Sequence, residues 1–323
     1  MSSRTPPQSI DFHAHFSDPV VYEKTVPHNV MSGFGAKVPP PDAPRIARQL
    51  DPQLQVADMD ERGIDVHVIS SSQVIVGTWW AQAKEADELV RRQNDRAAEW
   101  VARYPQRFVG AFDLPLQDID LALKELERAT DQLGLKVANL PAGWGAHYLG
   151  DPPFHPLLAE LERRNVLCFI HPDGTKDPWY QAYGMWNSIG QSIEEVKVMT
   201  SIIYNGVFDI HPALRIIVAH GGGFLPHNMA RLDRNVTNLP RSMANISRKP
   251  SEYLRNFYYD TCVYDVGVLA ALAKSVGIDR LVMGGDYPVG NDPLDFLRSA
   301  AFLSAEEREA IVVGNAAALL GLL

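Results

Sequence analysis

Eight short β-like runs alternate with helix-like runs along the chain, and this order limits the possible folds more than any other feature of the sequence. Several runs are almost continuously apolar, as strands covered on both faces should be. The runs are Ile10–Phe16, Val66–Ser71, Phe108–Leu114, Leu135–Leu140, Val166–His171, Arg215–His220, Phe257–Cys262 and Leu281–Asp286. Strands that alternate with helices form parallel sheets, and eight such units favour a closed (β/α)8 barrel over an open sheet.

The segments between these runs have the apolar spacing of amphipathic helices. We expect helices over Ala81–Tyr104, Leu121–Gln132, Pro156–Asn165, Ser192–Phe208 and Val266–Val276. The main irregular region, His28–Pro52, is rich in Gly and Pro and follows the first strand. We interpret it as an inserted loop or lid at the active-site end of the barrel, with a tolerated surface insertion as the alternative. Residues 1–323 are then one barrel domain.

Charge and composition exclude several classes of protein. The chain has 30 Lys and Arg against 39 Asp and Glu, a formal net charge of −9, and this argues against binding to a nucleic-acid backbone. No stretch approaches the roughly 18 consecutive apolar residues of a membrane span. The N-terminal residues also lack the apolar core of a secretory signal. These observations predict a cytoplasmic protein that binds neither nucleic acid nor a membrane.

Polar side chains stand at the carboxyl ends of four of the expected strands. His13 and His15 are two residues apart on the first strand, so both side chains point the same way and can bind one divalent metal. His171, His220 and Asp286 end the fifth, sixth and eighth strands. Catalytic residues of such barrels lie at the carboxyl ends of the strands. Packing alone does not readily explain why four histidines and an aspartate should stand there.

The motifs around these residues resemble those of the amidohydrolase superfamily. Within it, the resemblance is to the branch of 2-amino-3-carboxymuconate-6-semialdehyde decarboxylase and related aromatic-acid decarboxylases, and it spans nearly the whole chain. The motifs that carry it are Asp11–His15, His171–Pro172, Ala219–Gly223 and Gly285–Pro288.

This resemblance implies a metal held by His13, His15, His171 and Asp286. Three imidazoles and a carboxylate suit zinc, while manganese is the alternative. Lys136 stands at the start of the fourth expected strand rather than at its tip, so we expect one metal and not a lysine-bridged pair. The resemblance further implies catalytic roles for His220 and Asp286, with His220 and a metal-bound water handling the protons.

For the substrate, the resemblance points to Arg231. This arginine would bind a carboxylate, in some relatives across a subunit boundary, so a homodimer is expected; a surface arginine is the alternative. Trp179, Trp186 and His227 are candidate substrate contacts, although the tryptophans could equally pack their loop. Asp260 could orient a metal-ligating histidine or bind backbone in a turn.

These residues favour a metal-dependent, non-oxidative decarboxylase of a small unsaturated or aromatic carboxylic acid. The same site could instead serve a hydrolase of an amide, lactone or C–C bond, or a hydratase. A non-catalytic metal-binding subunit is a third class, but its ligand set should be broken, and here the set is complete.

Overall fold

A ring of eight parallel strands forms the centre of the computed structural model, which describes residues 6–28, 39–175 and 177–322. In order around the ring the strands are β1 (Ile10–Phe16), β2 (Val66–Ser71), β3 (Phe108–Phe112), β4 (Val137–Leu140), β7 (Leu167–Ile170), β8 (Arg215–Val218), β9 (Phe257–Asp260) and β10 (Leu281–Val282). The backbone N–H of Phe12 donates to the Met283 carbonyl at 2.8 Å, which joins the first strand to the end of the last. The predicted (β/α)8 barrel is therefore confirmed.

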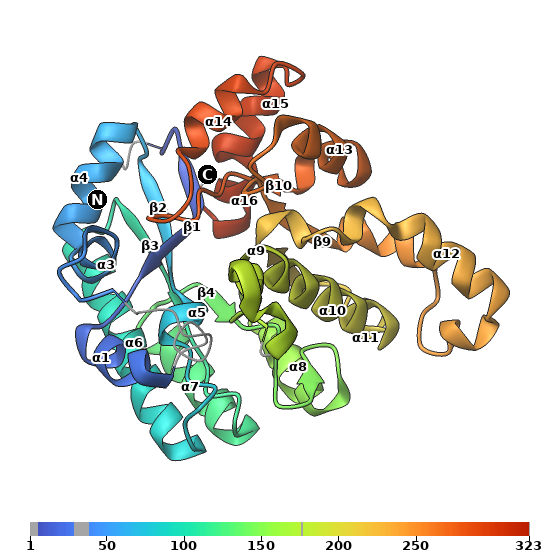
Figure 1. Cartoon of the computed structure of the whole chain (residues 1–323), viewed down its shortest axis with the longest axis horizontal. Helices are drawn as coiled ribbons and strands as arrows, with labels where there is room; N and C mark the ends of the chain where they lie inside the picture. Colours follow the sequence, from blue (N-terminus) through green and yellow to red (C-terminus); the bar gives the residue numbers. More distant parts are fainter. Residues whose placement is uncertain (1–5, 29–38, 176, 323) are drawn as a thin grey trace.

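Helices lie around this ring of strands (Figure 1). They are α1 (Pro19–Thr25), α3 (Pro44–Leu50), α4 (Pro52–Arg62), α5 (Gln73–Val76), α6 (Ala83–Arg103), α7 (Ile119–Asp131), α8 (His155–Arg163), α9 (Met185–Ser188), α10 (Gly190–Tyr204), α11 (Val207–Ile210), α12 (Met229–Asn238), α13 (Val266–Val276), α14 (Pro293–Ser299), α15 (Ala305–Glu309) and α16 (Asn315–Leu320). Among the described residues, no helix combines the length and the apolarity that crossing a membrane requires.

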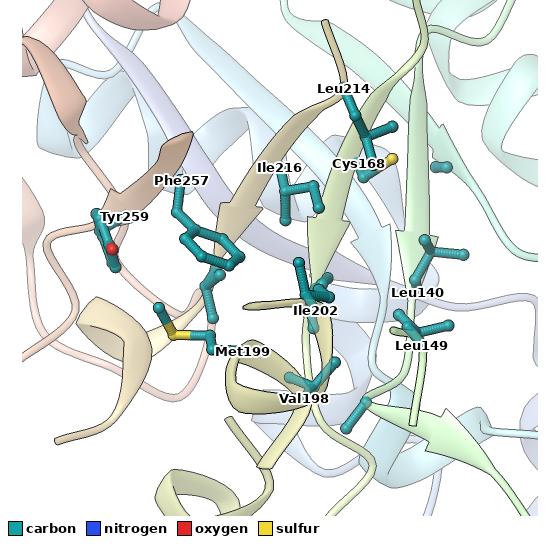
Figure 2. Close-up of a cluster of buried hydrophobic side chains, with 14 of the residues drawn as sticks. Leu140, Leu149, Cys168, Val198, Met199, Ile202, Leu214, Ile216, Phe257 and Tyr259 are labelled. Atoms are coloured by element: carbon teal, nitrogen blue, oxygen red, sulfur yellow. The ribbon is translucent and has the colours of Figure 1, made fainter. Parts of the chain in front are cut away.

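The strands are apolar on both faces because each face packs against other side chains. Phe169 and Ile217 belong to the cluster inside the ring, whereas Cys168 and Ile216, their neighbours in sequence, belong to the cluster under the helices. Figure 2 shows this outer cluster, in which Met199 and other side chains of α10 lie against the strands. Side chains alternate between the two faces of a strand, so burial on both sides produces the continuous apolar runs seen in the sequence.

Most of the expected elements are shifted by two residues or fewer at each end, and three segments differ more. The helix expected over Ser192–Phe208 is divided into α10 and α11, because Gly206 has a φ of 68° that ends the first helix. The eighth strand ends at Val282 rather than at Asp286, whose own φ is 56° and therefore not extended.

The region His28–Pro52 is not irregular throughout, because α3 occupies Pro44–Leu50 and α4 starts at Pro52. A proline in the first turn of a helix sacrifices no hydrogen bond, so these prolines start helices instead of breaking them. The part of the proposed lid at 29–38 lies outside the described residues.

Candidate active site

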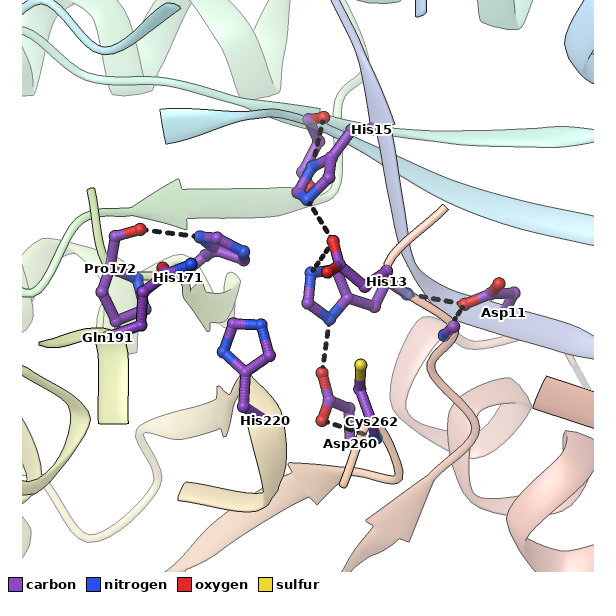
Figure 3. Close-up of polar contacts among 12 residues, drawn as sticks. Asp11, His13, His15, His171, Pro172, Gln191, His220, Asp260 and Cys262 are labelled. Carbon is purple, nitrogen blue, oxygen red and sulfur yellow. Dashed lines mark hydrogen bonds and ion pairs between the residues drawn. The ribbon is translucent and has the colours of Figure 1, made fainter. Parts of the chain in front are cut away.

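Three histidine rings meet at the carboxyl end of the barrel. The ring centroids of His13 and His15 are 5.0 Å apart, and that of His171 lies 4.9 Å from His13 and 5.0 Å from His15. Figure 3 shows the three rings, from β1 and the end of β7, pointing toward a common space. Asp286 completes the group, with its Oδ1 at 3.1 Å from His15 Nε2 and 3.4 Å from His13 Nε2.

This group has the chemistry of a metal site. One ligand atom from each of His13, His15, His171 and Asp286 lies within 4.8 Å of the other three. The Nε2 atom of His13 is fully buried and has no hydrogen-bond partner among the described residues. A buried nitrogen without a hydrogen bond is costly unless something else binds it, so the three imidazoles and one carboxylate fit a divalent cation.

Protein groups hold the opposite nitrogens of the rings. His13 Nδ1 lies 2.6 Å from Asp260 Oδ2, and His171 Nδ1–H donates to the Pro172 carbonyl at 2.8 Å. Such contacts fix both the orientation and the tautomer of a ligating imidazole, and they leave Nε2 free for a cation.

Burial and neighbouring charges set the protonation of these residues. Burial lowers the pKa of His13, and burial together with the other histidines lowers that of His171 further. For Asp286, burial alone would raise the pKa, but the facing His13 and His15 hold it below its ordinary value. Neutral imidazoles and an ionised carboxylate are the forms that bind metal.

His220 lies beside this group, and a buried carboxylate orients it. Its ring centroid is 5.1 Å from both His13 and His171, and its Nδ1–H donates to Glu195 of α10. Burial raises the pKa of Glu195 to about 7. Burial would lower the pKa of His220, but the charge and hydrogen bond of Glu195 outweigh it and raise the value to about 9. The Glu195 carboxylate therefore favours the protonated form of His220.

The sequence interpretation missed Glu195, although the sequence contains a signal for it. Glu195 shares the spacing i, i+3, i+4, i+7 with Val198, Met199 and Ile202, and all four are buried on one face of α10. A carboxylate on the apolar face of a helix is rarely found without a partner.

The glycines after His220 allow the turn that presents it. Gly221, Gly222 and Gly223 all have positive φ, and His220 itself has a φ of 51°. A Cβ atom at Gly222 would lie 2.9 Å from Cε1 of Tyr259 and 3.0 Å from Sδ of Met199. The His-Gly-Gly-Gly motif is thus required by both backbone conformation and close packing.

Two aspartates connect the strands that carry the histidines. Asp260 does both things that the sequence left open: Oδ2 contacts His13, and Oδ1 accepts the backbone N–H groups of Gly221 and Cys262, each at 3.1 Å. Asp11 Oδ1 accepts the N–H of His13 at 2.9 Å and that of Gly285 at 3.0 Å. Asp11 therefore links the backbone of β1 to the residue that precedes Asp286.

The fourth strand presents an amide, not an amine, to this end of the barrel. Lys136 Nζ lies 3.4 Å from the carbonyl of Leu320 in the C-terminal helix. Near the tip of β4, Asn139 donates to Asp113 Oδ1 at 2.7 Å within a buried polar network that the sequence interpretation missed. Burial raises the pKa of Asp113 to about 6.

The expected substrate residues lie outside the four-ligand group. Arg231 of α12 and His227 are exposed, and so is Trp179, at 68%. Trp186 of α9 is partly buried. All four belong to the segments that follow β7 and β8, the strands that supply His171 and His220.

The chain is similar in sequence to known decarboxylases. The chain is 30% identical to 2-amino-3-carboxymuconate-6-semialdehyde decarboxylase of Dictyostelium discoideum over 278 residues, which are 84% of this chain and 77% of the relative. It is 32% identical to gamma-resorcylate decarboxylase of Polaromonas sp. strain JS666 over 302 residues, which are 86% of this chain and 90% of the relative.

Solved structures of decarboxylases also superpose on the chain. The 5-carboxyvanillate decarboxylase of Sphingomonas paucimobilis superposes with a TM-score of 0.89 at 26% identity, covering 98% of this chain and 99% of that one. The dihydroxybenzoic acid decarboxylase of Polaromonas sp. JS666, which contains manganese and the inhibitor 2-nitroresorcinol, gives 0.84 at 29% identity, covering 97% of each chain. The amidohydrolase family profile matches residues 10–322, and the chain belongs to this family.

Proposed function

We propose that the protein is a divalent-metal-dependent, non-oxidative decarboxylase of a small aromatic or unsaturated carboxylic acid. The observation that carries the proposal is the hydrogen bond that holds His220 to the buried Glu195 beside a complete four-ligand group. Loss of CO2 leaves an electron pair on carbon, and a proton must replace the carboxyl group there. The Glu195 contact occupies Nδ1, so Nε2 of His220 is the atom that delivers this proton.

The residues that would hold the cation are His13, His15, His171 and Asp286. A divalent cation there would orient the acid and stabilise the negative charge that develops as CO2 leaves. We propose one cation per chain, because β4 offers Asn139 where a bridging lysine would be needed. The manganese in the Polaromonas enzyme favours manganese; zinc, which three imidazoles also suit, is the alternative that elemental analysis would identify.

Substrate contacts come from the segments after β7 and β8. We assign Arg231 to a substrate carboxylate, since a guanidinium binds carboxylates in a bidentate manner. Its exposure in the single chain suits a role across a homodimer interface. Trp179, Trp186 and His227 would line the entrance. Substitution Arg231→Ala should raise KM more than it lowers kcat.

The test is a set of carboxylic acids offered to the metal-loaded protein in D2O. The set includes gamma-resorcylate, 5-carboxyvanillate and 2-amino-3-carboxymuconate-6-semialdehyde, the acids named by the relatives. A decarboxylase releases CO2 and leaves deuterium on the carbon that lost it. Addition of water without CO2 release would contradict the proposal and indicate a hydratase or hydrolase.

The variant His220→Ala tests the proton donor. It should retain its metal and lose turnover, whereas His211→Asn should retain both. His211 contacts Glu162 at 2.9 Å and precedes β8, at the opposite end of the barrel, so it serves as a matched histidine control. Full activity of His220→Ala would refute the assigned role.

A further inference from the structure

Cys262 lies against the histidine group, and the proposed reaction does not use it. It follows β9, is 5% exposed, and its backbone N–H donates to Asp260 Oδ1. Its Sγ atom, one ring nitrogen of His13 and one ring nitrogen of His220 all lie within 4.8 Å of one another. In Figure 3 the Cys262 side chain points in the direction of the His13 ring.

We infer that His13, His220 and Cys262 form a second site, specific for soft cations such as Cd2+. In a tetrahedral site with bonds of about 2.0–2.3 Å, the ligand atoms are less than about 4 Å apart, which small rotations of these side chains can reach. A thiolate selects soft metals, whereas a carboxylate favours hard ones such as manganese. The four-ligand group contains no sulfur, so the two ligand sets differ in chemical preference.

The two sites share His13 and therefore interfere with each other. If the soft cation takes Nε2 of His13, the four-ligand group loses a ligand. If it takes Nδ1, the contact with Asp260 is broken. In both cases His220 is also engaged, so a bound soft cation removes the proposed proton donor. Coordination replaces the thiol proton of Cys262 and the Nε2 proton of His220, both of which pass to the solvent, and no redox step is needed.

A small cavity lies beside Cys262. Cys262 lines it together with Tyr264, Gly285, Asp292 and Phe296, and its volume of about 10 Å³ is about that of one water-sized sphere. An organic substrate does not fit such a space.

The test adds CdCl2 to the manganese-loaded protein and records the near-ultraviolet thiolate-to-cadmium charge-transfer band. The chain has two cysteines, so Cys168→Ser is a matched control; Cys168 lies in β7 under the helices. Wild type and Cys168→Ser should show the band with about one equivalent of Cd2+. Cys262→Ser should lack the band. It should also bind Cd2+ at least tenfold more weakly, because losing even a hydrogen-bond partner behind a ligand typically costs about 10–100-fold in metal affinity.

X-ray absorption spectroscopy of cadmium-loaded wild type keeps the test independent of folding in the variant. A cadmium–sulfur bond is expected, with displaced manganese measured in the same sample. A cadmium shell of nitrogen and oxygen alone, or a band of equal strength in Cys262→Ser, would overturn the inference.

Discussion

Replacing Asp260 by asparagine should weaken metal binding by about 10–100-fold while leaving the fold intact. Asp260 Oδ2 lies 2.6 Å from His13 Nδ1, and both side chains are fully buried. Its Oδ1 accepts two backbone N–H groups, and an asparagine Oδ1 can still accept them. The substitution therefore changes the partner of His13 and little else.

The size of the effect depends on which ring nitrogen of His13 carries the proton. In the wild type, His13 Nδ1–H donates to a carboxylate, which leaves Nε2 with its lone pair free for a cation. In Asp260→Asn an amide N–H faces Nδ1, so the ring proton moves to Nε2, the atom that points toward Asp286. Binding a cation must then move that proton back against an amide donor. The expected loss of 10–100-fold corresponds to about 1.4–2.8 kcal/mol.

Competition with a chelator measures the affinity, with Asp113→Asn as the control. Asp113 is also a buried, hydrogen-bonded carboxylate, but it contacts Gln73 and Asn139 instead of a ligand. Its replacement should leave the affinity for the metal within a few-fold of wild type. Unchanged affinity in Asp260→Asn, or an equal loss in both variants, would refute the reasoning.

Three further predictions concern the surroundings of the site. Glu195→Gln should lower kcat by up to about 100-fold at unchanged metal content, because His220 loses the carboxyl group that raises its pKa; equal kcat in a steady-state assay would argue against it. Gly222→Ala should lower stability by about 1–3 kcal/mol, seen as a lower thermal midpoint, because of its positive φ and the contact with Tyr259. Burial lowers the pKa of His67 to about 3, while the unfolded chain takes up this proton near pH 6.5. Stability should therefore fall as the pH drops from about 6.5 toward 3, by at most about 1.4 kcal/mol per pH unit for this group, and His67→Gln should fall less steeply in denaturant titrations.

The parts of the site that the sequence predicts are those set by position along a strand. His13, His15 and His171 follow from the period of two and from the rule that catalytic groups stand at carboxyl ends of barrel strands. Asp286 lies at the same end of the barrel, although β10 stops four residues before it. In a barrel, the end of a strand suffices to locate a residue even where the strand is short.

The parts that the sequence does not predict depend on pairs of residues far apart in the chain. His220 and Glu195 are 25 residues apart, and Asp11 and Gly285 are 274 apart. No local period joins such residues, because the contact exists only after the ring of strands has closed. The break between α10 and α11 is also not predicted, because Gly206 ends the first helix although the apolar spacing continues beyond it.

The contact of Asp11 with the N–H of Gly285 has a consequence for synthesis of the chain. A domain generally folds as a unit. His13 and His15 leave the ribosome well before Gly285 and Asp286 are made, so the contact of Asp11 with Gly285 forms late. A nascent chain that lacks Asp286 can present at most a three-histidine set, and complete loading of the proposed metal would have to wait for the closed barrel.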